Sequence, residues 1–326
     1  MLYSISRDDV VRTAIVRTSG SVELATQLWL FEDSVPIPSS VEIPVGTAAL
    51  DSLLRVADAP TLDRALKTAG GKADQLAKLA LTRLRAEGQK PLISGCRTAV
   101  YADILSQFSR SPKHLLQYAV LGAGAISTVT KTLVAISSQI NLTGNPMLLD
   151  AIIALFGYLR NCLESTDGFT WITQSVQAGL LIAFVECSPH FSKLDDAEDR
   201  EMITSIVKDV LPPYLVYRSV IRAVSEALDV VHKSSGISRV GNSAVGNVWK
   251  DFVVLAKERI LVEAHATAWK GKATMCDNAK VSATCMEIVC ILILSCSASK
   301  SIQSTISANV AHAALLTIAL QVNQLK

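Results

Sequence analysis

The sequence predicts an all-α fold, and three observations support this prediction. Apolar residues recur at helical three- and four-residue spacing through most of the 326 residues. The alternation typical of strands is nearly absent, and half of the residues are hydrophobic, which is enough for a large core. Several expected helices are apolar around much of their circumference and must bury both faces. We therefore expect an irregular, armadillo-like α-solenoid of stacked antiparallel helices, although no fixed sequence period is found.

The first half of the chain shows clear helix signals. Residues Thr47 to Ala57 and Lys72 to Glu87 carry leucines at helical spacing, and Gly88 is expected to end the second of these helices. Ser111-Pro112 and Asn145-Pro146 each combine an N-cap residue with a proline suited to the first helical position. A helix is expected to begin at each of these two pairs.

The second half continues the series with four further helices. They are expected at Phe169 to Cys187, Asp195 to Val210, Tyr214 to Val231 and Asn242 to Trp269, with Pro212-Pro213 as a kink or break before the third. The segment Ser34 to Gly46 contains three prolines and is expected to be a non-helical linker or an edge segment.

The composition changes abruptly near the C-terminus. Residues 281 to 326 carry only Glu287, Lys300 and Lys326 of the 60 acidic and basic side chains. We therefore expect a helical domain at residues 1–270 and a poorly defined tail at residues 271–326. The apolar runs of the tail are shorter than the roughly 20 residues that a membrane span needs, so no membrane partner is expected.

Charge and targeting signals narrow the expected partners and location. The net charge is only +2 and both signs are interspersed, which gives no reason to expect a nucleic acid partner. The N-terminus is polar and resembles neither a secretory signal nor a transit peptide. An intracellular protein, cytoplasmic or nuclear, is expected, with reduced cysteines.

No combination of residues indicates an enzyme. Cys96 follows Gly95 in a turn, and a reactive thiol there is the main catalytic candidate. Gly122 and Gly124 resemble a dinucleotide-binding turn but lack the preceding strand and the later acid, so close approach of two helices is the favoured explanation. The acidic run Asp195 to Asp199 lacks calcium-loop spacing and is expected to open a helix. The five histidines are scattered and form no metal motif: His114, His190, His232, His265 and His312.

The C-terminal cysteines raise the question of zinc. Cys276, Cys285, Cys290 and Cys296 are separated by eight, four and five residues. Structural zinc sites need closely spaced pairs such as Cys-x-x-Cys to direct two thiolates at one ion. This set contains no such pair, so it does not by itself predict a zinc site.

Four segments carry a resemblance to a known family. They are GFTWITQSVQAGLLIAFVEC (168–187), LPPYLVYRSVIRAV (211–224), WKDFVVLAKER (249–259) and MCDNAK (275–280). Together they resemble a fungal family that has a long helical region followed by a C-terminal MYND-type zinc finger. The resemblance covers about a third of the chain well and the preceding helices loosely. It implies an interaction scaffold whose finger holds two structural zinc ions through eight ligands and grips short proline-containing peptides.

Transferred to this chain, the resemblance supplies only Cys276 as a remnant zinc ligand. Val281 occupies the position of the second cysteine, and the other cysteines do not match the spacing of the family. Residues Lys280 to Ser282 are codable by a splice-donor sequence, so read-through of an intron would explain the altered tail. We expect a truncated or frame-altered finger that binds no zinc.

Three functions follow from these expectations. The first is a non-enzymatic protein-interaction scaffold of the MYND-type family with a non-functional finger. The second is a metal-free helical-repeat module that binds a short peptide or a helix of a protein partner. An enzyme with an unrecognised site ranks last.

Overall fold

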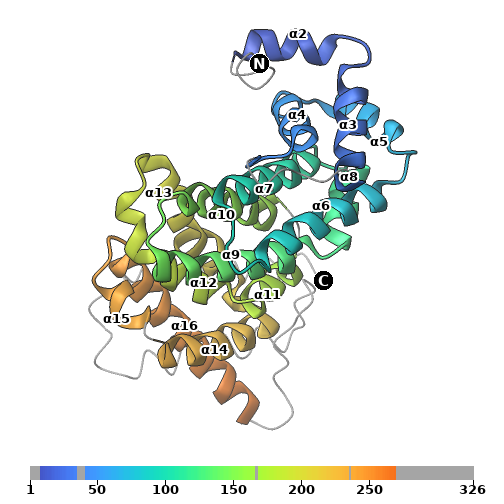
Figure 1. The fold of residues 1–326 in the computed structure, drawn as a ribbon. Helices are drawn as coiled ribbons and strands as arrows, with labels where there is room; N and C mark the ends of the chain where they lie inside the picture. The colour runs from blue at the N-terminus through green and yellow to red at the C-terminus, as the bar shows by residue number, and fades with distance from the viewer. Residues whose placement is uncertain (1–7, 35–40, 166–167, 235, 269–326) are drawn as a thin grey trace, which may run out of the picture. The chain divides into compact units, whose positions relative to one another are not determined.

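The computed structural model describes residues 8–34, 41–165, 168–234 and 236–268, and every regular element in these ranges is a helix (Figure 1). The all-α prediction is therefore confirmed for the described residues. The chain divides into two units, residues 1–260 and residues 261–326. The fold below is that of the first unit, and the predicted tail at 271–326 lies outside the described residues.

The N-terminal helices form a group with a small core of its own. This group comprises α2 (Asp9–Arg17), α3 (Ser21–Phe31), the short 3₁₀ helix η1 (Glu32–Ser34), α4 (Val45–Leu54) and α5 (Ala59–Thr68). Its separate apolar cluster is formed by Val16, Val22, Ala25, Leu53 and Ala65. Aspartates begin two of these helices, because the Asp8 side chain accepts from the Val10 amide and the Asp58 side chain from the Thr61 amide.

Five helices build the centre of the unit, and all of them except α8 are longer than the helices of the N-terminal group. They are α6 (Ala73–Gly88), α7 (Gly95–Arg110), α8 (Leu115–Gly122), α9 (Ala125–Thr143) and α10 (Leu148–Ser165). Helix α9 packs against α6, α8, α10, α11 and α12, and its residues Ile126, Val129, Leu133 and Ile136 are fully buried. A helix buried on most sides matches the apolar circumference seen in the sequence.

The third group runs from α11 to α16. Its elements are α11 (Phe169–Gln177), α12 (Leu180–Cys187), η2 (Ser188–Lys193), α13 (Ala197–Ser205), a π-helical turn η3 (Ile206–Val210), η4 (Pro212–Val216), α14 (Arg218–Lys233), α15 (Gly236–Gly241) and α16 (Gly246–Ala268). A cluster of buried aromatic rings connects α12, η2 and α16. In it, Phe184 packs against Phe191 and Trp249, and also against Phe156 of α10.

Several contacts join α-helices that are three apart when the α-helices alone are counted. Helix α4 contacts α7, α6 contacts α9, α7 contacts α10, and α9 contacts α12. The same relation continues in α10 with α13, α11 with α14 and α12 with α15. The relation is interrupted, since α5 with α8 and α8 with α11 share at most weak contacts, so the packing is only partly regular.

Several predicted helix boundaries are wrong for local reasons. The single helix expected at Phe169 to Cys187 is two helices, because Gly179 adopts a φ of 109° between α11 and α12. The helix expected to begin at Ser111 begins three residues later, where the ring of His114 accepts from the Leu116 amide. Helix α4 begins at Val45, inside the segment expected to be non-helical.

Candidate functional site

Helix α3 exposes an apolar stripe on the face that is turned away from the core. Leu24, Leu28 and Phe31 follow one another at intervals of four and three residues, and they are 58%, 44% and 65% exposed. This spacing places all three on one face of the helix. The opposite face buries Val22, Ala25, Thr26 and Trp29. Helix α3 is therefore apolar on both faces, although only one of them is covered in the described structure.

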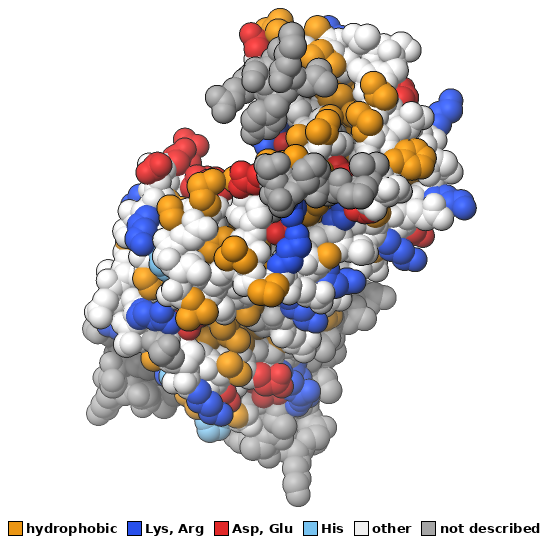
Figure 2. Space-filling model, in the orientation of Figure 1, with side chains coloured by type: hydrophobic (Ala, Val, Ile, Leu, Met, Phe, Trp, Pro, Cys, Tyr) orange, Lys and Arg blue, Asp and Glu red, His pale blue; other side chains and the backbone are white. Residues whose placement is uncertain are grey.

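The start of α4 extends this stripe. Val45 is 68% exposed, and the next residue, Gly46, lies against the main chain of α3. A β-carbon at Gly46 would lie 2.6 Å from the carbonyl carbon and oxygen of Leu28. Figure 2 shows hydrophobic side chains gathered on the surface over α3 and α4. We call Leu24, Leu28, Phe31 and Val45 the α3 stripe.

A second surface feature is an open pocket between α6 and α9, with a volume of about 450 Å³. Its cationic side chains are Arg85 from α6 and Lys131 from α9. Nη2 of Arg85 donates to Oγ1 of Thr128 at 3.2 Å, which fixes the guanidinium at the rim. The remaining lining residues are Gly88, Gln89, Ala123, Gly124, Ser127, Thr128 and Thr132. No acidic side chain belongs to this lining, so the pocket has a positive character.

The two glycines that resemble a dinucleotide-binding turn lie beside this pocket but have a different role. Helix α8, rather than a strand, precedes Gly124, so the fingerprint is not formed. The expectation of close helix approach is also wrong, because a β-carbon at Gly122 or Gly124 would meet no atom within 4 Å. Gly124 has a φ of 86° and forms the turn at which α8 and α9 bend by 60°.

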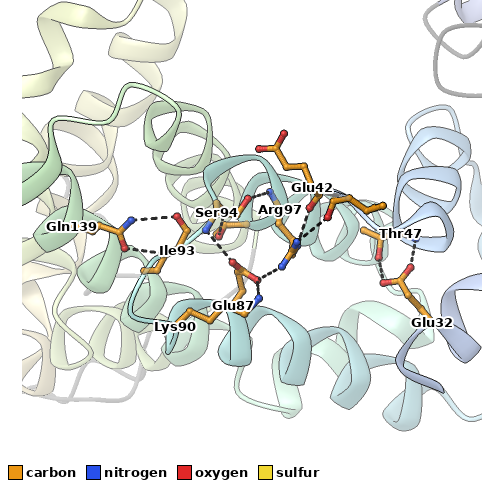
Figure 3. A network of polar contacts seen from close by, with 11 residues as sticks. Glu32, Glu42, Thr47, Glu87, Lys90, Ile93, Ser94, Arg97 and Gln139 are labelled. Atoms are coloured by element: carbon orange, nitrogen blue, oxygen red, sulfur yellow. Dashed lines mark hydrogen bonds and ion pairs between the residues drawn. The ribbon is translucent and has the colours of Figure 1, made fainter. Parts of the chain in front are cut away.

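A buried carboxylate holds the loop between α6 and α7 (Figure 3). Glu87, which is 2% exposed, accepts from Nζ of Lys90 at 2.6 Å, from the Ser94 amide at 3.0 Å and from Nη1 of Arg97 at 3.3 Å. Arg97 also donates to the main-chain oxygen of Glu42 at 3.0 Å. Glu87 therefore holds the loop and the first turn of α7 against α6. Arg97 holds the first turn of α7 against the segment before α4.

The side-chain amide of Gln139 completes this network from α9. It accepts from the Ile93 amide at 2.9 Å and donates to the Ile93 carbonyl at 3.3 Å (Figure 3). The loop residues Pro91 and Leu92 are exposed beside this fixed point. The two hydrogen bonds from Gln139 hold the loop against α9.

The catalytic candidate of the sequence, Cys96, lacks the electrostatics of a nucleophile. Burial, followed by a hydrogen bond with Glu42 and its charge, raises the pKa of the Cys96 thiol to about 11. A catalytic cysteine needs a lowered pKa so that the thiolate is present near neutral pH. Cys96 therefore carries a protonated thiol at the start of α7, which argues against its use as a nucleophile.

Three histidines of the described ranges, His114, His190 and His232, make hydrogen bonds within the chain. His114 Nε2 lies 3.1 Å from Oδ1 of Asp63, and His190 Nε2 lies 2.9 Å from Oδ1 of Asn141. His232 Nδ1 lies 2.6 Å from the Leu228 carbonyl. Burial, with the nearby charges of Lys193 and Arg239, lowers the pKa of His190. The contacts of His114 and His190 join separate elements, whereas that of His232 lies within α14.

The acidic run after Leu194 opens a helix, as the sequence predicts. The Asp196 side chain accepts from the Glu198 amide at 2.8 Å and caps α13. Within the ranges that the structure describes, no three histidine, cysteine, aspartate or glutamate side chains are grouped to hold a metal ion. Cys276, Val281, Cys285, Cys290 and Cys296 all lie outside those ranges, as does His312.

Within the described ranges, no single helix combines the length and the apolarity of a membrane span. Helices α8 and α9 reach both only when they are taken together, across their bend.

The chain matches no protein-family model, no curated protein and no solved structure. The resemblance to the fungal MYND-type family therefore stays a prediction from the four sequence segments. The α3 stripe and the α6–α9 pocket are the two surface features that sequence reasoning missed. Only the first had a signal in the sequence, because SVELATQLWLF is apolar at more positions than one buried face requires.

Proposed function

We propose that this chain is a non-enzymatic protein-interaction scaffold, built as an irregular armadillo-like stack of helices. The contacts between α-helices that are three apart among the α-helices support the stack, since each repeat of a solenoid packs against its neighbours. The raised pKa of Cys96 supports a non-enzymatic role.

The single observation that carries the proposal is the α3 stripe. Three large apolar side chains at positions i, i+4 and i+7 form the seam that an amphipathic helix recognises on another helix. Val45 adds an exposed apolar side chain next to Gly46, which packs against the main chain of Leu28. The occupant that we propose is therefore an amphipathic helix of a partner protein, with its own apolar residues at intervals of three and four.

The resemblance to MYND-type proteins adds a second element to the proposal. On this reading the helical region keeps its interaction role, while the tail after Lys280 no longer forms the finger. The alternative is a helical-repeat binding module that never had a finger. Both readings use the α3 stripe in the same way, and neither requires the chain to bind zinc.

The test is a selection of helical peptides from a display library against the full chain, followed by measurement of their dissociation constants. Leu28→Asp places a charge in the centre of the seam and should weaken the selected peptides at least about tenfold, because a desolvated charge without a partner opposes docking. Leu142→Asp is the matched control, because Leu142 is 86% exposed at the end of α9. Circular dichroism would verify that both variants remain helical.

Two outcomes would overturn the proposal. Peptides that bind equally well to the Leu28→Asp variant would place the interaction elsewhere. A stable dimer of the chain that dissociates in the Leu28→Asp variant, measured by light scattering, would make the stripe a contact between two copies of this chain.

A further inference from the structure

We propose that the α6–α9 pocket binds a phosphate monoester, independently of the protein-interaction role. The pocket brings together one guanidinium and one ammonium group from two helices that are distant in the sequence, Arg85 on α6 and Lys131 on α9. Two cations on different walls can contact one dianionic group from two directions. An arginine fork and a lysine point charge are the side chains that proteins most often direct at phosphate.

Neither cation is neutralised by an acid in the described part of the chain. Arg85 donates only to the neutral Thr128 hydroxyl, and neither Arg85 nor Lys131 takes part in an ion pair there. Two other arginines differ in this respect, since Arg83 on α6 and Arg97 on α7 both lie close to carboxylates. The two pocket cations are thus available to a ligand.

The helices that form the pocket offer few acidic side chains that could compete with a ligand for Arg85 and Lys131. Helices α8 and α9 contain no aspartate or glutamate, and Lys131 is their only charged side chain. The one buried acid near the end of α6, Glu87, is engaged by Lys90, Arg97 and the Ser94 amide. An anion in the pocket would therefore meet a local excess of positive charge.

The neutral lining groups and the size of the pocket indicate the kind of anion. The Ser127 hydroxyl and the Gln89 side-chain amide supply further donors to a many-oxygen group. Gly124 leaves open space where a side chain would project. A volume of about 450 Å³ falls in the range of small-molecule sites and exceeds what a bare phosphate ion fills. The pocket therefore has room for an organic group attached to the phosphate.

The experiment is calorimetric titration of the full chain at low ionic strength with glycerol 3-phosphate and with inorganic phosphate. The variants Arg85→Gln and Lys131→Gln each remove one cation and should weaken binding of the ester about tenfold or more, since a hydrogen bond to a charged group is lost. Lys78→Gln is the matched control, because Lys78 is an exposed lysine on α6 outside the pocket. This control removes the same charge and should keep the affinity of the wild-type chain.

The outcomes separate a site from general electrostatic attraction. Tighter binding of the ester than of inorganic phosphate, lost in both pocket variants, supports the proposal. Absence of binding, equal weakening by Lys78→Gln, or full affinity in both pocket variants overturns it. A phosphoserine peptide forms a further arm: binding of the peptide without binding of glycerol 3-phosphate overturns the proposal of a small-molecule site.

Discussion

The α-carbon of Gly95 lies against the main-chain carbonyl of Met147. A β-carbon at position 95 would be 1.8 Å from the Met147 oxygen and 2.6 Å from its carbonyl carbon. Gly95 is the first residue of α7, and Met147 directly precedes α10. The hydrogen side chain of glycine thus allows α7 to meet the start of α10, and these two helices contribute much of the central core.

We predict that Gly95→Ala lowers the free energy of unfolding by about 3 kcal/mol, because main-chain atoms must move to accommodate the methyl group. Urea denaturation followed by circular dichroism measures this change. Gly122→Ala is the matched control: a β-carbon there meets no atom within 4 Å, and alanine in a helix is favoured over glycine by about 0.5–1 kcal/mol. Equal stability of the two variants would mean that α7 and α10 adjust without cost.

The sequence predicted the helices more accurately than their ends or their packing. The leucine pattern of Lys72 to Glu87 identified α6 within one residue at each end, because its periodicity and its stop signal agree. The break at Gly179 was missed, since a glycine within an apolar helical run has the same sequence signal whether its φ is negative or positive. The contacts between α-helices three apart depend on how the helices pack, and this information is absent from local periodicity.

The candidate sites were harder to predict than the fold for a related reason. Arg85 and Lys131 are 46 positions apart, and nothing in either local sequence indicates that α6 and α9 bring them to one pocket. In contrast, the capping role of the acids after Leu194 was predicted correctly, because it depends only on neighbouring residues. Contacts that are local in sequence could be inferred, whereas those made by packing could not.

The buried carboxylate of Glu87 provides a second prediction. Glu87→Ala should lower the free energy of unfolding by about 3 kcal/mol, because the Ser94 amide loses its acceptor and Arg97 loses its buried counter-charge. Denaturant titration of the purified variant measures the loss. Glu164→Ala removes an exposed ion pair with Arg160, with atoms 3.0 Å apart, and should cost only about 0.5 kcal/mol. A similar loss in both variants would contradict a structural role of the Glu87 network.

The acids around Arg55 predict a dependence of stability on pH. Nη2 of Arg55 lies 2.8 Å from Oδ2 of Asp103 and 3.1 Å from Oδ2 of Asp51. Burial, and then the charge of Asp51, raise the pKa of Asp103 from 3.8 to about 6, against the opposing effect of Arg55. The folded chain therefore binds the Asp103 proton more tightly than the unfolded chain does.

Because the folded-state pKa is the higher one, Asp103 favours folding when it is protonated. This contribution is complete below about pH 4 and is lost as the pH rises to about 6. We predict that the stability of the wild-type chain relative to Asp103→Asn falls across this interval and is constant above it. Denaturation series at several pH values measure the difference. A relative stability that rises with pH would mean that the ion pair with Arg55 outweighs burial.

Zinc content provides the last prediction, and it concerns the question that Cys276 raises. A structural zinc site needs four ligands, whereas the resemblance to the MYND-type family supplies one thiolate, with Val281 at the second position. We therefore expect near-zero zinc by elemental analysis of the purified full chain, and the same value for Cys276→Ala. Incubation of the reduced chain with zinc before desalting tests whether metal was lost during purification. One or two bound zinc ions per chain, lost in Cys276→Ala, would show that the irregularly spaced cysteines form a metal site and that the finger is intact in a different form.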